Sequence, residues 1–402
     1  MKKNCFFRRL NLSKGLICGV ICLFISCNND DIKMDEVVND NLENSIPVSN
    51  LQVIAELVAN IVDNGIVLEE VKQGVEMSKF FGLDEELRFT DILQPKESKM
   101  FRSSSANQLS QILRSLFNDH KPFTLRSSGD ELETFVLDNN VQIYWPYSEN
   151  WDGKEIPVVT FNNGSKNANN VTAYKKVTDD NGFSSIEKIT VNEEYAKKHP
   201  VWVINENDLS YDDLPDFMNG EFEKNGVFFY SETASKKTTS FRASNSALML
   251  ESLQATKQYD DWLNGGSEFE FKLSQPLAPS YSTSGNNVYR ISISRSDISN
   301  KKTFYPNYPL NTNWTVEQVQ NGLKIVETDT GGSKNWSFNL GVKILGEDLS
   351  IAASIPYGSN DDHLFESILD RAYIESSVMN GPTKVFYSND NGFNWRMHLM
   401  SY

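Results

Sequence analysis

The cysteines of this chain point to one covalent modification. All four lie within the first 27 positions. A basic start, an apolar run over Leu16–Ile25 that is too short to cross a bilayer, and a small residue, Ser26, before Cys27 are typical of a secretory signal peptide. The end of this segment resembles a bacterial lipobox, with Phe24 at the position where leucine is commonest. We therefore expect residues 1–26 to be removed and a diacyl group on Cys27 to hold the protein on a membrane.

Residue counts exclude several kinds of catalytic and metal site. The mature chain has a single cysteine, so it forms no internal disulfide and has no cysteine-ligated metal site. Its four histidines lie far apart in the sequence, so metal motifs such as HExxH are absent. The phosphate-binding P-loop, the GxGxxG motif and the GxSxG nucleophile elbow are absent as well.

The mature chain is strongly acidic. Removal of residues 1–26 leaves 33 basic and 54 acidic residues, a net charge of −21. Such a surface repels phosphates, which argues against nucleic acid and anionic lipid as partners. We therefore expect membrane attachment through the lipid on Cys27 rather than through a basic patch.

Four aromatic residues in one short segment are candidates for ligand binding. Tyr144, Trp145, Tyr147 and Trp151 lie on either side of Pro146. Exposed aromatic rings offer flat faces on which sugars stack. The same residues are also typical of a sheet core in which alternate rings point inward and the proline bends an edge strand. Both interpretations remain open at the level of sequence.

Acidic pairs occur along the chain and raise the question of hydrolytic chemistry. Two of them are Asp212–Asp213 and Asp260–Asp261. A glycosidase needs two carboxylates roughly 5–10 Å apart, one of them with a raised pKa. Spacing in the sequence does not show which acids converge, so we assign no catalytic residue.

The sequence contains no complete calcium-binding loop, and we expect no cofactor. The alternative is a Ca²⁺ site at one end of a sheet sandwich, built by oxygen ligands from separate turns. Its candidate ligands are Asp329, Asn360, Asp361, Asp362 and Asp390. Solvated loop acids would give the same pattern.

A motif close to the C-terminus predicts a tight turn. The segment Ser388-Asn-Asp390-Asn-Gly392-Phe-Asn-Trp395 resembles an Asp-box. In such a turn the aspartate accepts backbone N–H groups, the glycine adopts a positive φ and the tryptophan packs beneath. The chain has one good copy and no repeat of propeller length. We interpret the motif as a hairpin turn and not as part of a sialidase.

The expected fold is α+β and dominated by β-structure. An acidic flexible tether at residues 27–48 precedes a small helical subdomain at residues 49–120. Residues 121–230 are expected to form an antiparallel β domain that packs with these helices. A Ser/Thr-rich linker is placed at residues 231–255 and a β-sandwich at residues 256–402.

Hydrophobic periodicity predicts the individual elements. Apolar residues at helical spacing predict three helices, at Leu51–Ile61, Val67–Phe80 and Leu109–Asn118. Alternating and β-branched residues predict strands from residue 133 onward, among them Glu133–Asp138 and Ala372–Ser376. The chain is expected to end on its last strand.

Three segments resemble a known group of proteins, namely Ile143–Gly153, Glu194–Lys197 and Pro200–Asn205. They are similar to lipoproteins of Bacteroides-type bacteria for which no activity is established, over roughly the N-terminal 230 residues. The acidic run Asn28–Asp31 also resembles the export signal of surface lipoproteins in such bacteria, with an ordinary disordered linker as the alternative. The resemblance implies a lipid-anchored protein of the outer membrane, exposed on the cell surface, and implies no mechanism.

These features predict a non-enzymatic surface lipoprotein that binds an extracellular glycan or an envelope protein. One alternative is a carboxylate-dependent hydrolase of polysaccharide or peptidoglycan, which paired carboxylates in an aromatic-lined cleft would favour. A second alternative is a structural or adhesive subunit in which the exposed edge of the last strand pairs with another chain.

Overall fold

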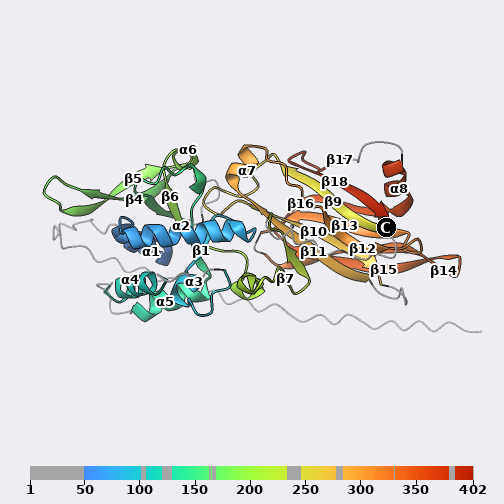
Figure 1. Ribbon diagram of the computed structural model, residues 1–402, viewed down its shortest axis with the longest axis horizontal. Helices are drawn as coiled ribbons and strands as arrows, with labels where there is room; N and C mark the ends of the chain where they lie inside the picture. The colour runs from blue at the N-terminus through green and yellow to red at the C-terminus, as the bar shows by residue number, and fades with distance from the viewer. Residues whose placement is uncertain are drawn as a thin grey trace, which may run out of the picture. The chain divides into compact units, whose positions relative to one another are not determined.

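The computed structural model covers most of the chain beyond the tether (Figure 1). The described residues are 49–100, 106–119, 129–162, 164, 169–232, 246–277, 284–329, 331–379 and 385–401. The predicted signal peptide, Cys27 and the tether lie outside them, as does most of the predicted linker. Within these residues, every helix is too short or too polar to cross a membrane.

Helices dominate the start of the described chain, as predicted. They are α1 (Asn50–Ile61), α2 (Gly65–Phe80) and α4 (Ala106–Asp119). Ser49 and Asn64 cap α1 and α2, since each side-chain oxygen accepts a backbone N–H from the first turn of its helix. These bonds satisfy donors that would otherwise have no partner within the helix.

The prediction of a strand at Glu133–Asp138 was wrong, because this segment is the end of helix α5 (Gly129–Asp138). Leu132 and Val136 are both buried in the core beneath the helices. A spacing of four residues puts them on one helical face, and this period outweighs the strand-like composition of the segment. A short helix, α3 (Phe89–Leu93), completes the helical region.

A six-stranded sheet packs against these helices. Its strand order is β1-β2-β6-β3-β4-β5. The strands are β1 (Glu86–Arg88), β2 (Val141–Tyr144), β3 (Val158–Phe161), β4 (Val171–Thr178), β5 (Ser184–Val191) and β6 (Val201–Glu206). Neighbours are antiparallel except β3 and β6, which are parallel, so the sheet is mixed where a purely antiparallel one was predicted. Because β1 comes from the helical region, helices and sheet form one layered structure.

Both faces of this sheet are buried. On β6, Trp202 and Ile204 pack into the core shared with the helices, while Val201 and Val203 pack on the opposite face. Trp262, from the loop after strand β9, joins the core on that opposite face. The sheet is therefore covered on one side by helices and on the other by a loop from the C-terminal region.

Two further sheets pack as a β-sandwich around one core. The six-stranded sheet has the order β16-β13-β10-β11-β8-β7. Its strands are β7 (Glu223–Lys224), β8 (Val227–Phe229), β10 (Ser267–Pro276), β11 (Ser284–Ile293), β13 (Gln320–Glu327) and β16 (Asp362–Asp370). The four-stranded sheet consists, in order, of β12 (Tyr308–Trp314), β9 (Ser246–Ala255), β18 (Phe393–Ser401) and β17 (Val385–Tyr387). Phe271 and Trp395, one from each sheet, are among the buried residues of the shared core.

Several predicted boundaries differ from the structure. Ser246–Ala255 was placed in the linker, but this largely buried segment forms β9, an interior strand. Ala372–Ser376 was predicted as a strand but belongs to helix α8 (Arg371–Met379). The last strand, β18, pairs with β9 on one side and with β17 on the other. Strand β17 covers only Asn394–Arg396 of β18, and pairing of this strand with another chain stays a prediction.

Two long hairpins and several short helices complete the fold. Strands β14 (Ser333–Ile344) and β15 (Glu347–Gly358) pair in continuous register as a two-stranded sheet, drawn at the right of Figure 1. The other long hairpin is formed by β4 and β5. The remaining helices are α6 (Glu193–Ala196), α7 (Arg295–Ser299) and the 3-10 turns η1 (Ser148–Asn150), η2 (Tyr211–Asp213) and η3 (Phe217–Asn219).

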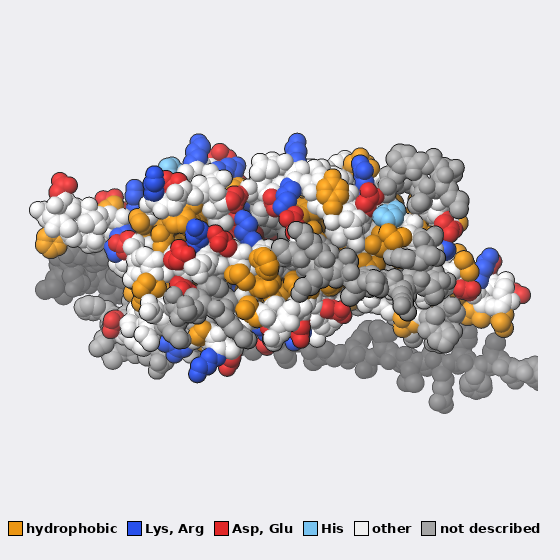
Figure 2. Space-filling view, viewed as in Figure 1, with side chains coloured by type: hydrophobic (Ala, Val, Ile, Leu, Met, Phe, Trp, Pro, Cys, Tyr) orange, Lys and Arg blue, Asp and Glu red, His pale blue; other side chains and the backbone are white. Residues whose placement is uncertain are grey.

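The Asp-box motif forms the hairpin turn that the sequence predicted, but the positive φ, +58°, falls on Asn391 and not on Gly392 as expected. It joins β17 to β18. Asp390 Oδ1 accepts the Gly392 N–H at 2.9 Å, and Ser388 Oγ accepts the Phe393 N–H at 2.9 Å. Trp395 is buried beneath the turn. On the face drawn in Figure 2, acidic and basic side chains are interspersed, so the net negative charge is not gathered there.

Candidate functional site

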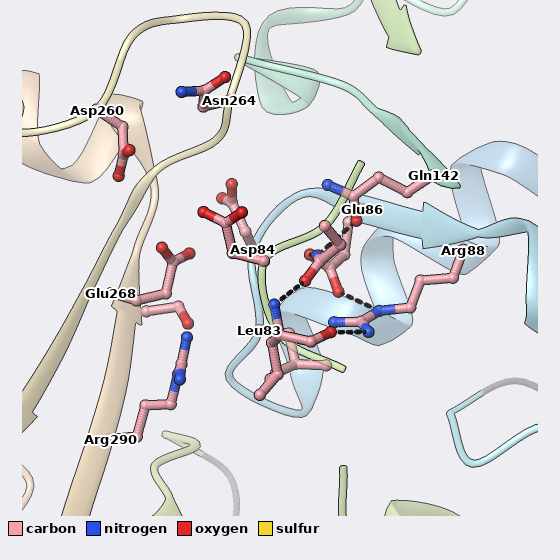
Figure 3. Close-up of a pocket in the computed structure, with 13 residues that line it drawn as sticks. Leu83, Asp84, Glu86, Arg88, Gln142, Asp260, Asn264, Glu268 and Arg290 are labelled. Carbon is pink, nitrogen blue, oxygen red and sulfur yellow. Dashed lines mark hydrogen bonds and ion pairs between the residues drawn. The ribbon is translucent and has the colours of Figure 1, made fainter. Parts of the chain in front are cut away.

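Four carboxyl groups from separate segments converge, those of Asp84 and Glu327 on buried residues and those of Asp260 and Glu268 on partly buried ones. Asp84 lies in the loop between α2 and β1, Asp260 in the loop between β9 and β10, Glu268 on β10, and Glu327 at the end of β13. Carboxylate oxygens of Asp260, Glu268 and Glu327 lie within 4.8 Å of one another. Asp84, Asp260 and Glu268 line one cavity, and Figure 3 shows their carboxyl groups turned toward the same space. We call these four residues the acidic cluster.

Backbone geometry brings the cluster together. Pairing of β10 with β13 places Glu327 opposite Phe269, one residue from Glu268. The Gly266 N–H donates to Asp84 Oδ2 at 2.6 Å, which ties the loop before β1 to the start of β10. A Cβ atom on Gly266 would clash with the Ile293 carbonyl, so this close approach requires glycine.

Basic side chains near the cluster have acidic partners of their own. Arg88 Nε donates to Glu86 at 2.9 Å, and Arg290 Nη1 donates to Glu270 at 3.1 Å. In the described part of the chain, no lysine, arginine or histidine nitrogen lies within 4.0 Å of a carboxylate of the acidic cluster. Carboxylates without a cation are costly to bury unless they bind protons or an ion.

Burial favours the protonated forms of these acids. It raises the pKa of Asp84 to about 6 and the pKa of Asp260 to about 7. Burial and the adjacent Asp260 raise the pKa of Glu327 to about 12, and burial raises the pKa of Glu268 well above its ordinary value. At neutral pH and without a bound cation, the cluster therefore retains protons.

The cavity at the acidic cluster is small. Its free volume is about 30 Å³. A buried water needs roughly 10–15 Å³ of such volume, whereas cavities for organic ligands have roughly 300–1,000 Å³. The cavity therefore has room for an ion with a water molecule and not for a sugar ring.

Two of the predicted binding residues are sealed in the core. Tyr144 is fully buried on the sheet face opposite the helices. Trp145 is 1 % exposed, and its ring packs between Trp151 at 5.2 Å and Trp202 at 5.7 Å, centroid to centroid. A ring enclosed on both faces offers no surface for stacking, so ligand binding at Tyr144 and Trp145 remains a prediction without geometric support.

The other two predicted residues, Tyr147 and Trp151, line a cavity of about 190 Å³, which we call the Trp151 cavity. Its wall also includes Asn150, Asp152, Glu155, Ala196, Lys198, His199 and Pro200. The indole Nε1 of Trp151 donates to the Glu155 carbonyl at 2.8 Å, which fixes the ring. His199 Nδ1 lies 2.9 Å from Glu155 Oε1, so the imidazole and the carboxylate are held together.

The acids predicted to bind Ca²⁺ have other roles in the structure. Asp361 accepts the N–H groups of Gly358 at 2.7 Å and Asp329 at 3.2 Å, which shapes the loop after β15. Asp390 accepts backbone and side-chain donors within the Asp-box turn and pairs with Lys257 at 2.8 Å. Calcium binding by this set stays a prediction.

Sequence reasoning noted Asp260 as part of an acidic pair and missed the other members of the acidic cluster. Glu268 alternates with phenylalanine in a strand, which is the ordinary pattern of a solvent-facing residue. Asp84 opens the acidic run Asp84–Glu86, and Glu327 lies in an unrelated segment. Convergence of such residues leaves no local signal in the sequence.

Comparison with known proteins does not assign this chain to a family. No protein-family model matches the chain, and comparisons with curated proteins and with solved structures found no similar protein. The resemblance to lipoproteins of Bacteroides-type bacteria therefore stays a prediction. What the protein does has to be inferred from its own residues.

Proposed function

We propose that the mature protein is a lipid-anchored protein of the outer cell surface that binds an extracellular glycan, without catalysis, at the Trp151 cavity. The observation that carries this proposal is the combination, in one surface cavity, of the partly exposed Trp151 ring with the polar groups of Asp152, Glu155 and His199. Tyr147 also lines the cavity but is only 4 % exposed. Attachment to the membrane is assigned to the lipid on Cys27.

The chemistry of the Trp151 cavity suits a sugar. Aromatic rings pack against the C–H faces of a sugar, and carboxylates accept its hydroxyl groups. Asp152 is held in place because its Oδ1 accepts the N–H groups of Lys154 at 2.9 Å and Glu155 at 3.2 Å. The free volume of about 190 Å³ is below that of cavities enclosing a whole drug-sized ligand, which suits recognition of one sugar unit of a longer chain.

Two observations speak for binding rather than hydrolysis. The acidic cluster contains carboxyl groups with raised pKa, but its cavity is too small for a sugar. In the Trp151 cavity, the N–H groups of Lys154 and Glu155 lower the pKa of Asp152. A glycosidase needs a general acid with a raised pKa facing the substrate, and Asp152 does not meet this requirement.

A glycan-array screen of the mature chain tests the proposal. We expect binding to a defined set of glycans, with Trp151→Ala lowering the signal about fivefold or more, because the loss of one stacking ring costs roughly 1 kcal/mol or more. Tyr305→Ala is the matched control, since Tyr305 is 63 % exposed in a different part of the fold. Trp145→Ala is unsuitable, because removal of a buried ring destabilises the whole protein.

The array result shows whether the Trp151 cavity binds a glycan. Binding that Trp151→Ala abolishes and Tyr305→Ala retains supports the Trp151 cavity. Binding unchanged in Trp151→Ala, or no glycan bound by a folded protein, contradicts the proposal and directs attention to a protein partner.

One observation favours an envelope protein as a second candidate partner. Leu345 forms the tip of the β14–β15 hairpin, is 101 % exposed and has a φ of +53°. A leucine in this left-handed conformation costs about 1–2 kcal/mol, and asparagine is preferred at such turns. We expect Leu345→Asn to stabilise the hairpin and to reduce cross-linking to a partner in the outer membrane. Unchanged cross-linking would remove the tip from consideration.

A further inference from the structure

We propose that the acidic cluster binds one hard divalent cation, Ca²⁺, which links the loop before β1 to the β-sandwich. Its ligands are carboxylate oxygens of Asp260, Glu268 and Glu327, which lie within 4.8 Å of one another, together with Asp84. This site is separate from the Trp151 cavity and does not depend on glycan binding.

The donor set selects the type of metal. Asp260, Glu268 and Glu327 supply oxygen only, and the residues lining the cavity include no histidine or cysteine. Oxygen donors without nitrogen or sulfur suit Ca²⁺, Mg²⁺ or Mn²⁺ and not Zn²⁺ or Cu²⁺. Two oxygens from each of three carboxylates, with one from Asp84, fall within the roughly six to eight that Ca²⁺ takes. Mg²⁺ needs near-octahedral geometry and keeps several waters, for which a cavity of about 30 Å³ has too little room.

An observation outside the three-acid group also points to a bound ion. Asp84 is 4 % exposed, lines the same cavity and uses Oδ2 for the Gly266 N–H, while its Oδ1 has no hydrogen-bond donor among the described residues. Glu327, 1 % exposed, likewise has an Oε1 without a donor there. Buried polar atoms without partners are rare in native proteins and commonly mark an ion or a water.

The surrounding charges are compatible with a divalent ion. The nearest cation shown beside Glu268 in Figure 3 is Arg290, whose Nη1 is engaged by Glu270 at 3.1 Å. On the opposite wall, Arg88 is paired with Glu86 at 2.9 Å. The ionised carboxylates of the acidic cluster therefore have an excess of negative charge, which a divalent ion offsets. Binding of the ion releases the protons that the carboxyl groups hold without it.

Bound Ca²⁺ would join segments that are far apart in the chain. Asp84 comes from the layer of helices and sheet, whereas Glu268 and Glu327 belong to the sandwich. A cation shared by these carboxylates adds to the Asp84–Gly266 hydrogen bond between the same two regions. The ion is therefore expected to be structural, and its binding energy adds to the stability of the folded state.

The proposal is tested by calorimetry and by thermal unfolding. Both use the full chain, purified in detergent and freed of bound metal with EDTA. Titration with CaCl₂ is expected to show about one binding event per chain. At a Ca²⁺ concentration of about 100 times Kd, the Tm is expected to rise by about 4 °C. MgCl₂ at the same concentration is expected to give a much smaller shift.

Substitutions identify the site. Asp260→Asn and Glu268→Gln each remove a ligand oxygen and are expected to weaken Ca²⁺ binding at least about 100-fold. In EDTA their Tm is expected to stay close to that of the natural protein, since a neutral amide replaces a carboxyl group that forms no ion pair within 4.0 Å among the described residues. Asp348→Asn removes the same charge from the exposed β14–β15 hairpin and is expected to leave binding unchanged.

Three results would overturn the proposal. The first is the absence of both heat and Tm shift up to 10 mM CaCl₂, which is about ten times the weakest Kd of extracellular calcium sites, roughly 1 mM. The second is a calcium response that Asp260→Asn and Glu268→Gln retain, and the third is an equal response to Mg²⁺. Because the EDTA measurement shows whether each variant folds, a misfolded variant is not mistaken for a lost site.

Discussion

Arg295 provides a quantitative test of how the two regions are held together. Its buried guanidinium donates through Nε and Nη2 to Glu193 Oε1 at 3.0 and 2.9 Å, and through Nη1 to the carbonyls of Asp260 and Gly265 at 2.9 and 3.2 Å. Glu193 belongs to α6 on the side of the mixed sheet, whereas the two carbonyls lie in the loop that leads into the sandwich. Arg295→Met removes all of these bonds and keeps most of the apolar volume.

The expected cost of Arg295→Met follows from the partners left behind. Breaking a fully buried ion pair from one side costs about 3–5 kcal/mol, but Glu193 is 30 % exposed and keeps a hydrogen bond from Tyr147. The carboxylate contribution is therefore about 1–2 kcal/mol, and each carbonyl left without a donor adds about 1 kcal/mol. The sum is about 3–4 kcal/mol, a large part of the roughly 5–15 kcal/mol that stabilises a typical protein.

Pairing with Arg295 also explains the titration of Glu193. Burial acts to raise the pKa of Glu193, but the Arg295 charge and the Tyr147 hydroxyl outweigh it, so the pKa lies below its ordinary value. Because the folded-state pKa is lowered, this contribution to stability is present above the unfolded pKa and is lost as pH falls through the folded pKa. The effect of Arg295→Met should accordingly shrink in acid.

Urea unfolding followed by tryptophan fluorescence measures the change, with Cys27→Ala as the common background. Arg295→Lys keeps the charge but cannot reach all three acceptors, so we expect about half the loss. Arg396→Met, at an exposed position, is the matched control and should change the free energy of unfolding by less than about 0.5 kcal/mol. A loss below about 1 kcal/mol for Arg295→Met would refute the view that this side chain joins the two regions.

Three further substitutions probe other features. Cys27→Ala should release the protein from the membrane fraction after cell lysis, and tight attachment of the variant would contradict lipidation. Gly82→Ala should lower the free energy of unfolding in urea by about 3 kcal/mol or more, because φ is +82° and the new Cβ would overlap the Tyr230 carbonyl. Its control is Gly182→Ala, which should cost only about 1 kcal/mol because φ is also positive, +83°, but the space around it is open. Equal losses for the two variants would argue against the clash. Ser388→Ala should lower the Tm through loss of about 1–2 kcal/mol in the Asp-box turn, and an unchanged Tm would show that the Ser388 hydrogen bonds contribute little.

The helices α1, α2 and α4 were predictable because their signals are local. Apolar residues repeat at helical spacing, and Ser49 and Asn64 cap the helices to which they are adjacent. Helix α5 shows where local reasoning fails: its β-branched and aromatic residues favour a strand, but the buried positions Leu132 and Val136 follow the helical period. Burial of a helical face against α4 and β2 overrode intrinsic preference.

Strand order was beyond prediction. The apolar run Ala247–Leu250 in β9 is consistent with a buried strand, but the Ser/Thr-rich residues before it favoured a linker. Strand β18 comes last in the chain but lies between β9 and β17, because hydrogen bonding to both sides buries its backbone. Pairing between strands distant in sequence depends on long-range contacts that periodicity does not encode.

The sequence by itself determined the dominance of β-structure and the turn around Asp390, and it predicts lipid attachment at Cys27, since each signal depends on residues within short segments. Only the tertiary structure decided that Trp145 is enclosed while Trp151 lines a cavity, because burial depends on what covers each face of the sheet. The acidic cluster was decided in the same way. Its members come from four segments that are far apart in the sequence, and their proximity follows from folding those segments together.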